Sequence, residues 1–273
     1  MLFNPGEQAT LAGEIEFEGI GLHTGAPCKV RIGGAKVGTG IVFRAGSATI
    51  PATPFNVIDT SRGTSLGLDG EKVVCIEHLL SALAGVGVDN AVCEVIGPEL
   101  PALDGSSLPY VRKFLECGLE MQGKERPCYR LSRLVAEGRG ASMLVASPED
   151  FFSASYLLRY DNPMIGLSFG TFGSKDDFTS QIAPARTFGL YAEAEELRKR
   201  GLALGAGPQN ALIVYDDHID PELRFPDEFV RHKLLDMLGD LSLAGGAVLG
   251  SFTGITTGHS VNVAMARRLR ECN

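Results

Sequence analysis

The spacing of apolar residues predicts two helices that each turn one face toward a hydrophobic core. In the first, over residues 75–86, apolar residues recur at i, i+3, i+4 and i+7, which is one face of a helix. These residues are Ile76, Leu79, Leu80 and Leu83. In the second, over residues 227–244, the apolar stripe is Val230, Leu234, Met237 and Leu241. Asp227, which follows Phe225-Pro226, predicts the start of this second helix as its N-cap.

Segments on either side of these helices follow the same order in both halves of the chain. The first half predicts strands within residues 10–70, the helix over 75–86, a strand over 90–96 and a helix over about 107–117. After a polar link over 118–126, the second half predicts strands within 129–216, the helix over 227–244, a strand over 247–252 and a helix over about 260–271. We therefore expect an α+β fold of two repeats, residues 1–122 and 123–273, with the helices between two sheets.

Each half also contains a segment that we expect to be inserted into the repeat. Residues 43–70 are rich in Pro, Gly and Thr, which is typical of turns and predicts a flap. Near residues 188–207, a short helix over 192–200 is framed by apolar pieces. From the residues alone, this second segment predicts a packed excursion on the surface.

The polar face of the second helix carries His232, Asp236 and Asp240 on one stripe, because these positions are four residues apart. An imidazole and a carboxylate at i and i+4 can share one small cation. Taken alone, the same spacing is also typical of a solvated polar face.

The first helix adds Glu77 and His78 in its first turn. Neighbouring residues on a helix diverge by about 100°, so His78 fits a metal ligand while Glu77 fits a base that acts on water. His78, His232 and Asp236 then form a set of three ligands with an open fourth position, which is the composition of a catalytic zinc site. The alternative for Glu77 is a first-turn acid that only complements the helix macrodipole.

The cysteines do not indicate a structural zinc site. All six lack the Cys-x-x-Cys spacing that such sites use, and they stand at positions 28, 75, 93, 117, 128 and 272. We expect them to be buried free thiols of a protein in a reducing compartment.

Six segments resemble, in order, those of the UDP-3-O-acyl-N-acetylglucosamine deacetylases, which are zinc amidases of lipid A biosynthesis. The segments are Gly19-Ile-Gly-Leu-His-Thr-Gly25, Ile76-Glu-His-Leu79, Leu103-Asp-Gly-Ser106, Ala185-Arg-Thr-Phe-Gly189, Phe229-Val-Arg-His-Lys-Leu-Leu-Asp236 and Gly258-His259. They cover nearly the whole chain. The resemblance implies a fold of β-α-α-β layers and the zinc-dependent hydrolysis of the acetamide of UDP-3-O-acyl-N-acetylglucosamine.

The resemblance also implies roles for further residues. Thr187 would donate a hydrogen bond to the oxyanion, His259 would protonate the leaving amine, and Asp240 would hold His259 charged and oriented. Lys233 would contact the phosphates of the nucleotide, although the residue pattern alone favours a solvated lysine. The insert near residues 188–207 would form an apolar passage for the acyl chain, lined by Phe188, Leu197, Leu202 and Leu204.

Alternatives stay open at several positions. His23 could be a fourth ligand, but support of its own loop is favoured because an open site needs only three ligands. His259 could replace Asp236 as the third ligand, against the i, i+4 spacing that favours Asp236. His218 lies in a polar loop that predicts an exposed turn. Gly63 stands where some family members carry a cysteine near the metal, so we expect altered metal or inhibitor behaviour more than altered activity.

Charge and hydropathy narrow the class of protein. A net charge of −8 argues against a nucleic-acid binder, because phosphate contacts need a basic face. No apolar run approaches the roughly 20 residues that a membrane-spanning helix needs. We expect a cytoplasmic monomer that binds one Zn²⁺, or Fe²⁺ in its place, and a UDP-acyl-amino-sugar.

Two other functions are compatible with the scaffold. The first is a metal-dependent amidase for a different sugar or for a substrate without an acyl chain. The second is a binding protein for acylated sugars that has lost catalysis. The second is disfavoured because a binding protein has no need of a base, an oxyanion donor and an acid together.

Overall fold

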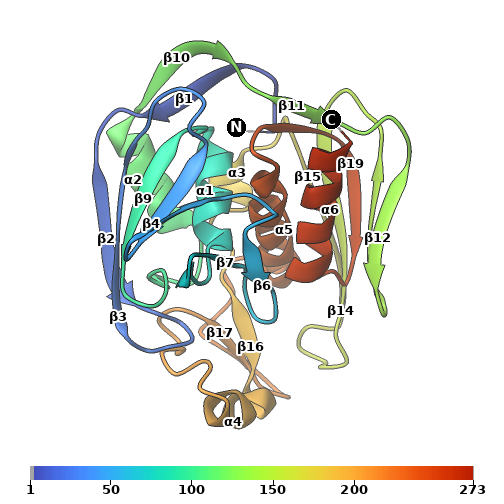
Figure 1. The fold of residues 1–273 in the computed structure, drawn as a ribbon. Coiled ribbons are helices and arrows are strands. Elements are labelled where there is room, and N and C mark those ends of the chain that lie inside the picture. The colour runs from blue at the N-terminus through green and yellow to red at the C-terminus, as the bar shows by residue number, and fades with distance from the viewer. Residues whose placement is uncertain (1–2, 273) are drawn as a thin grey trace.

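The first half of the molecule is a five-stranded sheet with two helices (Figure 1). The computed structural model describes residues 3–272. The strands, in their order across the sheet, are β2 (Ile15–Ile20), β3 (Pro27–Gly34), β9 (Ala91–Ile96), β4 (Ile41–Ala45) and β5 (Ala48–Pro51). The helices are α1 (Glu77–Val86) and α2 (Leu108–Cys117).

The second half repeats this arrangement. Its strands, in order, are β12 (Val135–Arg139), β13 (Ser142–Ser147), β19 (Ala247–Ile255), β14 (Phe152–Arg159) and β15 (Leu167–Gly173), with β11 (Cys128–Arg130) also paired to β19. Its helices are α5 (Glu228–Leu241) and α6 (His259–Glu271). Among the five corresponding strands, one pair is parallel in each half, β4 with β9 and β14 with β19. The α+β class and the predicted repeat are confirmed.

The helices lie between the two sheets, and α1 packs against α5 (Figure 1). Both predicted apolar stripes are buried. Gly239 permits the close approach of the two helices, because a Cβ atom at this position would lie 2.2 Å from the backbone oxygen of Glu77. The two helices that carry the candidate site residues are therefore held at a distance that only glycine allows.

One local prediction is wrong and another is confirmed. The expected polar link contains β10 (Leu119–Glu125), which pairs with β1 (Glu7–Leu11). Most of β10 is exposed, so it lacks the apolar pattern of a strand. Asp227 is the N-cap residue of α5, as predicted, although its carboxylate makes no capping bond and instead pairs with Arg231 at 2.6 Å. The predicted repeat boundary lies within β10 and stays a prediction.

Each half adds a small three-stranded sheet. In the first half it consists of β6 (Val57–Asp59), β7 (Ser65–Leu68) and β8 (Glu71–Val73). We call residues 57–73 the flap; it is shorter than predicted, because residues 43–51 run into the main sheet as β4 and β5. In the second half the insert consists of β16 (Phe188–Leu190), α4 (Tyr191–Lys199), β17 (Leu212–Val214) and β18 (Ile219–Asp220).

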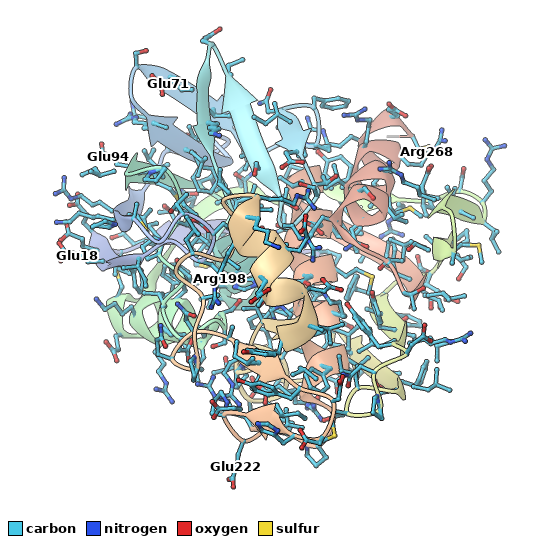
Figure 2. The ribbon with its side chains drawn as sticks, turned by 90° about the horizontal axis from the view of Figure 1, so that it is seen from below. Glu18, Glu71, Glu94, Arg198, Glu222 and Arg268 are labelled. Atoms are coloured by element: carbon cyan, nitrogen blue, oxygen red, sulfur yellow. The ribbon has the colours of Figure 1, made fainter. Side chains whose placement is uncertain are left out.

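Seen from below, α4 lies across the middle of the molecule (Figure 2). Glu18 of the first half projects on one side of α4 and Arg268 of the second half on the other. The remaining helical segments are short, α3 (Phe178–Gln181) and the 3₁₀ turn η1 (Ser242–Ala244). Within residues 3–272, none of the helices is long and apolar enough to cross a membrane.

Candidate metal centre and active site

The structure brings together the three predicted metal ligands from both halves of the chain. His78 lies in the first turn of α1, and His232 and Asp236 lie one turn apart on α5. Asp236 Oδ1 is 3.3 Å from His232 Nε2 and 3.7 Å from His78 Nε2. The two imidazole rings are perpendicular, with centroids 5.0 Å apart. Their ligating atoms therefore converge on one point between the two helices.

The donor atoms at this point fit a divalent cation. Asp236 Oδ1 is buried and has no hydrogen-bond partner within residues 3–272, which is costly unless a cation completes its shell. His232 Nδ1 lies 3.1 Å from the backbone oxygen of Ala185. That contact fixes the proton on Nδ1 and leaves the Nε2 lone pair directed at Asp236 and His78, as in metal-binding histidines.

The charge states of these groups suit metal binding. Burial lowers the pKa of His232 to about 3 and so keeps the ring neutral. Burial by itself would raise the pKa of Asp236, but the ammonium group of Lys233 holds it well below its usual range. A neutral imidazole and an ionised carboxylate are the forms that bind a metal.

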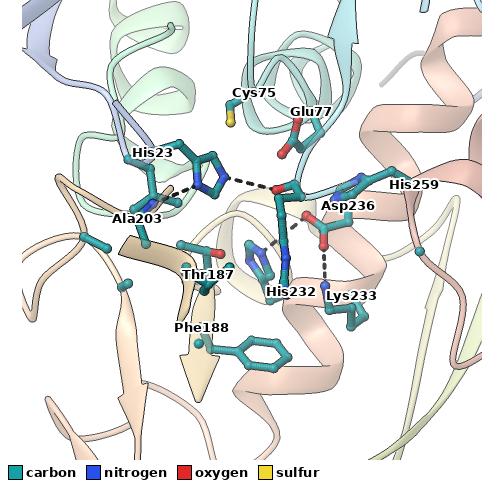
Figure 3. A pocket seen from close by; sticks show the side chains of 18 of the residues that line it. His23, Cys75, Glu77, Thr187, Phe188, Ala203, His232, Lys233, Asp236 and His259 are labelled. Atoms are coloured by element: carbon teal, nitrogen blue, oxygen red, sulfur yellow. Dashed lines mark hydrogen bonds and ion pairs between the residues drawn. The ribbon is translucent and has the colours of Figure 1, made fainter. Parts of the chain in front are cut away.

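Glu77 lies near Asp236 (Figure 3) but does not belong to the group of three ligands. Its side chain is buried, and its Oε2 accepts a hydrogen bond of 2.9 Å from the backbone N–H of Thr64. Burial raises the pKa of Glu77, and the carboxylates of Asp236 and Asp240 add to this, while His259 and His78 oppose it. A raised pKa suits a carboxylate that takes up a proton during a reaction.

His259 and Asp240 form a second charged pair in the same cavity. His259 Nδ1 is 3.0 Å from Asp240 Oδ2, and the Asp240 side chain is fully buried. Asp240 also accepts hydrogen bonds from Asn262 and Thr64. Burial alone would lower the pKa of His259, but Asp240 and, more weakly, Glu77 raise it to about 10. His259 is therefore a protonated acid at neutral pH.

Lys233 is held at the site rather than solvated. Its Nζ lies 2.8 Å from Asp236 Oδ2 and 5.2 Å from the centre of the Phe188 ring. Burial would lower its pKa, but Asp236 raises it above the usual value. Phe188 also packs edge-on against Phe229 and His232, so it walls the metal centre as well as the start of the insert.

Thr187 lies beside His232 in the cavity (Figure 3). A buried ion pair that sequence reasoning missed fixes its segment. Glu228, the first residue of α5, is fully buried and accepts three hydrogen bonds from Arg186, one of them from its backbone N–H. By fixing Arg186, the pair positions both of its neighbours. These are the Ala185 carbonyl, which orients His232, and Thr187. Arg186 stands inside a matched motif, but no residue pattern indicated Glu228 as its partner.

These residues open into one cavity of about 800 Å³. Its wall combines the metal centre, the turn at Asp59–Arg62 in the flap, and the insert, including Phe188 and Leu197. Leu202 and Leu204 were predicted to line it, but neither does, and 54% of Leu204 is exposed to solvent. An ion pair of 3.4 Å between Arg62 and Glu193 joins flap and insert across the cavity.

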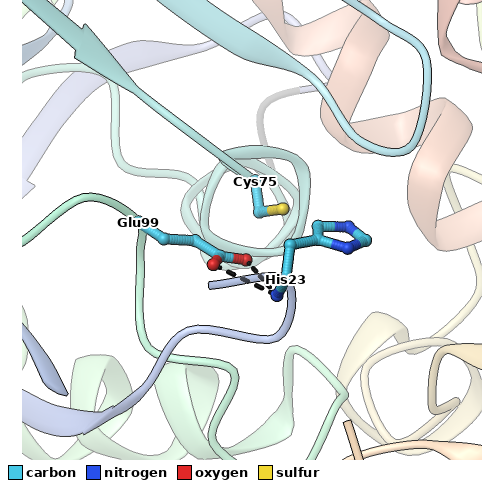
Figure 4. A group of neighbouring side chains, drawn as sticks. All are labelled: His23, Cys75 and Glu99. Atoms are coloured by element: carbon cyan, nitrogen blue, oxygen red, sulfur yellow. Dashed lines mark hydrogen bonds between the residues drawn. The ribbon is translucent and has the colours of Figure 1, made fainter. Parts of the chain in front are cut away.

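His23 supports its loop and is not part of the metal centre. With Cys75 and Glu99 it forms a separate group of metal-binding residue types (Figure 4). However, Glu99 accepts hydrogen bonds from the backbone N–H groups of His23 and Thr24. The His23 ring contacts the backbone oxygen of Arg62 and the backbone N–H of Ala203. These contacts explain the group as a junction between loop, flap and insert.

Among the other predictions for histidine and cysteine, that for His218 is confirmed and that for the burial of the cysteines is wrong in part. His259 pairs with Asp240 and is not grouped with the ligands. His218 is exposed beside Asp217, as predicted. All six cysteines are free, but only Cys28 and Cys93 are buried, and Cys272 is exposed. Cys272 follows α6 as its C-cap residue and lies outside the core, which is why the prediction of burial fails there.

The two-repeat fold and an N/N/O centre beside a buried carboxylate and a histidine–aspartate pair are the features of a metal-dependent hydrolase. The family model of UDP-3-O-acyl N-acetylglycosamine deacetylase matches residues 8–271, and the chain belongs to this family. The UDP-3-O-acyl-N-acetylglucosamine deacetylase of Myxococcus xanthus is 39% identical over 96% of this chain and 86% of its own length. The enzymes of that name from Geobacter sp. (strain M21) and Pseudomonas entomophila are 38% and 39% identical, each over 96% of this chain and 88% and 89% of their own lengths.

Proposed function

We propose that this protein hydrolyses the acetamide of UDP-3-O-acyl-N-acetylglucosamine to acetate and the free amine, the committed step of lipid A biosynthesis. The observation that carries the proposal is the convergence of His78, His232 and Asp236 beside Glu77 and His259 in one cavity. Membership of the deacetylase family supports the choice of substrate.

The first step is assigned to Glu77. A divalent metal held by His78, His232 and Asp236 would polarise the acetamide carbonyl and lower the pKa of a water molecule toward about 7. Glu77 takes the proton of that water as it attacks the carbonyl carbon. Its buried carboxylate, with a raised pKa, is suited to accept this proton.

Thr187 and His259 complete the reaction. The Thr187 hydroxyl donates a hydrogen bond to the oxygen that becomes negative when the carbonyl is attacked. His259, protonated through its pairing with Asp240, gives its proton to the amine nitrogen as the C–N bond breaks. The products are a neutral amine and acetic acid, which ionises to acetate by releasing its proton to solvent, and the proton that Glu77 accepted re-protonates His259.

The cavity provides room for the rest of the substrate. Lys233 places an ammonium group at the metal centre and is proposed to contact the nucleotide phosphates. The insert, with Phe188 and Leu197 on the cavity wall, is proposed to hold the acyl chain. Each buried methylene of such a chain contributes about 0.8 kcal/mol.

The finer assignments follow the same reasoning. Zinc is the proposed metal because two imidazoles, one carboxylate and an open position suit it, and Fe²⁺ is the alternative for this set. The nucleotide-sugar substrate supports a cytoplasmic location. A monomer suffices, because both halves of the site come from one chain.

The test is acetate release from UDP-3-O-acyl-N-acetylglucosamine compared with UDP-N-acetylglucosamine, which lacks the acyl chain. We expect a kcat/KM that is much higher for the acylated substrate. Equal values for the two would favour an amidase whose substrate needs no acyl chain. Binding of the acylated substrate without any acetate release from folded, zinc-loaded protein would favour a binding protein.

A further inference from the structure

One residue of the flap, Thr64, contacts both the base and the partner of the acid. Its backbone N–H donates to Glu77 Oε2 at 2.9 Å, and its hydroxyl donates to Asp240 Oδ1 at 2.6 Å. Its backbone oxygen accepts the N–H of Ile76, just before α1, at 3.0 Å. Thr64 is completely buried. All three of its hydrogen-bonding groups are therefore used within or beside the site.

These contacts connect groups that come from opposite halves of the molecule. Glu77 begins α1 in the first repeat, whereas Asp240 lies near the end of α5 in the second. The adjacent Gly63 leaves space for the base, because a Cβ atom there would lie 2.9 Å from Glu77 Oε1 and 3.1 Å from Cys75 Sγ. Gly63 thus leaves room for one oxygen of the Glu77 carboxylate, and Thr64 donates a hydrogen bond to the other.

Asp240 receives three hydrogen bonds, and they are divided between its two oxygens. Oδ1 accepts from Thr64, while Oδ2 accepts from His259 and Asn262, each at 3.0 Å. A donor on Oδ1 fixes the plane of the carboxylate, so that Oδ2 faces His259. It also shares the charge of Asp240, which limits how tightly Asp240 holds the proton that His259 must release.

We infer that Thr64 is a positioning residue that aligns the base Glu77 and, through Asp240, the acid His259. The inference rests on the proposed function for its kinetic readout. It makes the flap part of the catalytic apparatus and not only a wall of the cavity. A hydroxyl is required at position 64, whereas the contact to Glu77 uses the backbone.

The test compares variants that differ in this hydroxyl. Thr64→Val removes it at nearly constant volume and keeps the backbone N–H. We expect kcat to fall about tenfold, because a buried hydrogen bond to a charged group is lost, with KM and zinc content unchanged. Thr64→Ser retains the hydroxyl and should restore most of kcat. Thr49→Val, at an exposed position of β5, makes the same chemical change away from the site and should leave kcat unaltered.

A spectroscopic measurement reads the same contact without turnover. The His259 Nδ1 proton, which is shared with Asp240, should give an NMR resonance that moves downfield in Thr64→Val. The reason is that Asp240 then divides its charge between two donors instead of three. Thr64→Ser should leave the resonance at its wild-type position.

Three results would overturn the inference. One is a wild-type kcat together with an unshifted His259 resonance in Thr64→Val. Another is a loss of kcat that Thr64→Ser fails to restore, which would indicate packing. If Thr64→Val does not fold, Thr64→Cys takes its place, because a thiol is only a weak hydrogen-bond donor. The third contradicting result would then be equal rates for the Cys and Ser variants. A wild-type protein without turnover would concern the proposed function, and the NMR comparison would still decide the role of Thr64.

Discussion

The two repeats share one topology but contribute to the site in different ways. The first repeat supplies groups at the ends of its elements, with Glu77 and His78 as the first two residues of α1 and Thr64 just before β7. The second supplies groups along two turns of α5, with His232, Asp236 and Asp240 four residues apart, and adds His259 at the start of α6.

This difference places the proposed base in the first repeat and two of the three proposed metal ligands in the second. The first repeat holds the proposed base and a single proposed ligand, so its proposed role depends on how the start of α1 packs against α5. The second holds two proposed ligands and the proposed acid, all within or beside one buried helix. The site therefore exists only where α1 meets α5, and changes on the two sides should have different consequences.

The largest difference between the two repeats should appear when Glu77→Gln is compared with Asp236→Ala. Glu77→Gln removes the base but no ligand, so we expect turnover to fall by about 10²–10⁴-fold with a wild-type metal content. Asp236→Ala removes a ligand, so both turnover and metal content should fall. Steady-state rates and metal analysis of the purified variants measure this. A metal-free Glu77→Gln protein would contradict the division between base and ligands.

Loss of the proposed oxyanion donor, Thr187, should have the next largest effect. Thr187→Val keeps the shape of the side chain and removes its hydroxyl, which should lower kcat by about 10²–10³-fold, as for other such donors. Thr171→Val, at an exposed position of β15, is the matched control and should be unchanged. A kcat within twofold of wild type would exclude Thr187 from the reaction.

Gly239→Ala tests whether the close packing of α1 against α5 is needed for stability and activity. The new Cβ would lie 2.2 Å from the Glu77 oxygen, so α1 must move, and overpacking of this kind costs about 1–3 kcal/mol. We expect a lower free energy of unfolding and a lower kcat. Gly33→Ala, where the nearest atom is 4.0 Å away, is the control. Wild-type activity in Gly239→Ala would show that the site tolerates separation of the helices.

Asp240→Asn should change the pH dependence more than the rate at neutral pH. His259 must be protonated to act, and Asp240 is the main group that raises its pKa to about 10 against the effect of burial. Removing that charge therefore lowers the pKa of His259. The fall in rate at high pH should therefore begin at a correspondingly lower pH. Asp217→Asn, at the exposed Asp217–His218 pair, should leave the profile unchanged.

The smallest effect is expected in the insert. Leu197→Ala removes apolar surface from the cavity wall, which should lower kcat/KM for a long-chain substrate by about tenfold and leave a short-chain analogue unaffected. Leu204→Ala, on the same insert but exposed, should have no effect. Equal losses for both chain lengths would indicate a structural role for Leu197.

The sequence was sufficient where helical periodicity connects residues. The stripe of His232, Asp236 and Asp240 follows from spacing alone, and so does the burial of the apolar faces. Thr187 and His259 lie in no periodic pattern, and only the family resemblance indicated them. Thr64 could not be found, because it bonds Asp240 across 176 residues of the chain. The Arg186–Glu228 pair and strand β10 were missed for the same reason, since tertiary contacts define them.

The most direct test of the central claim is turnover of UDP-3-O-acyl-N-acetylglucosamine after removal of metal by a chelator and after zinc is restored, with metal content measured in parallel. We expect one metal ion per chain, lost turnover in the metal-free protein and recovery with zinc. Full turnover by a folded, metal-free protein would contradict this claim.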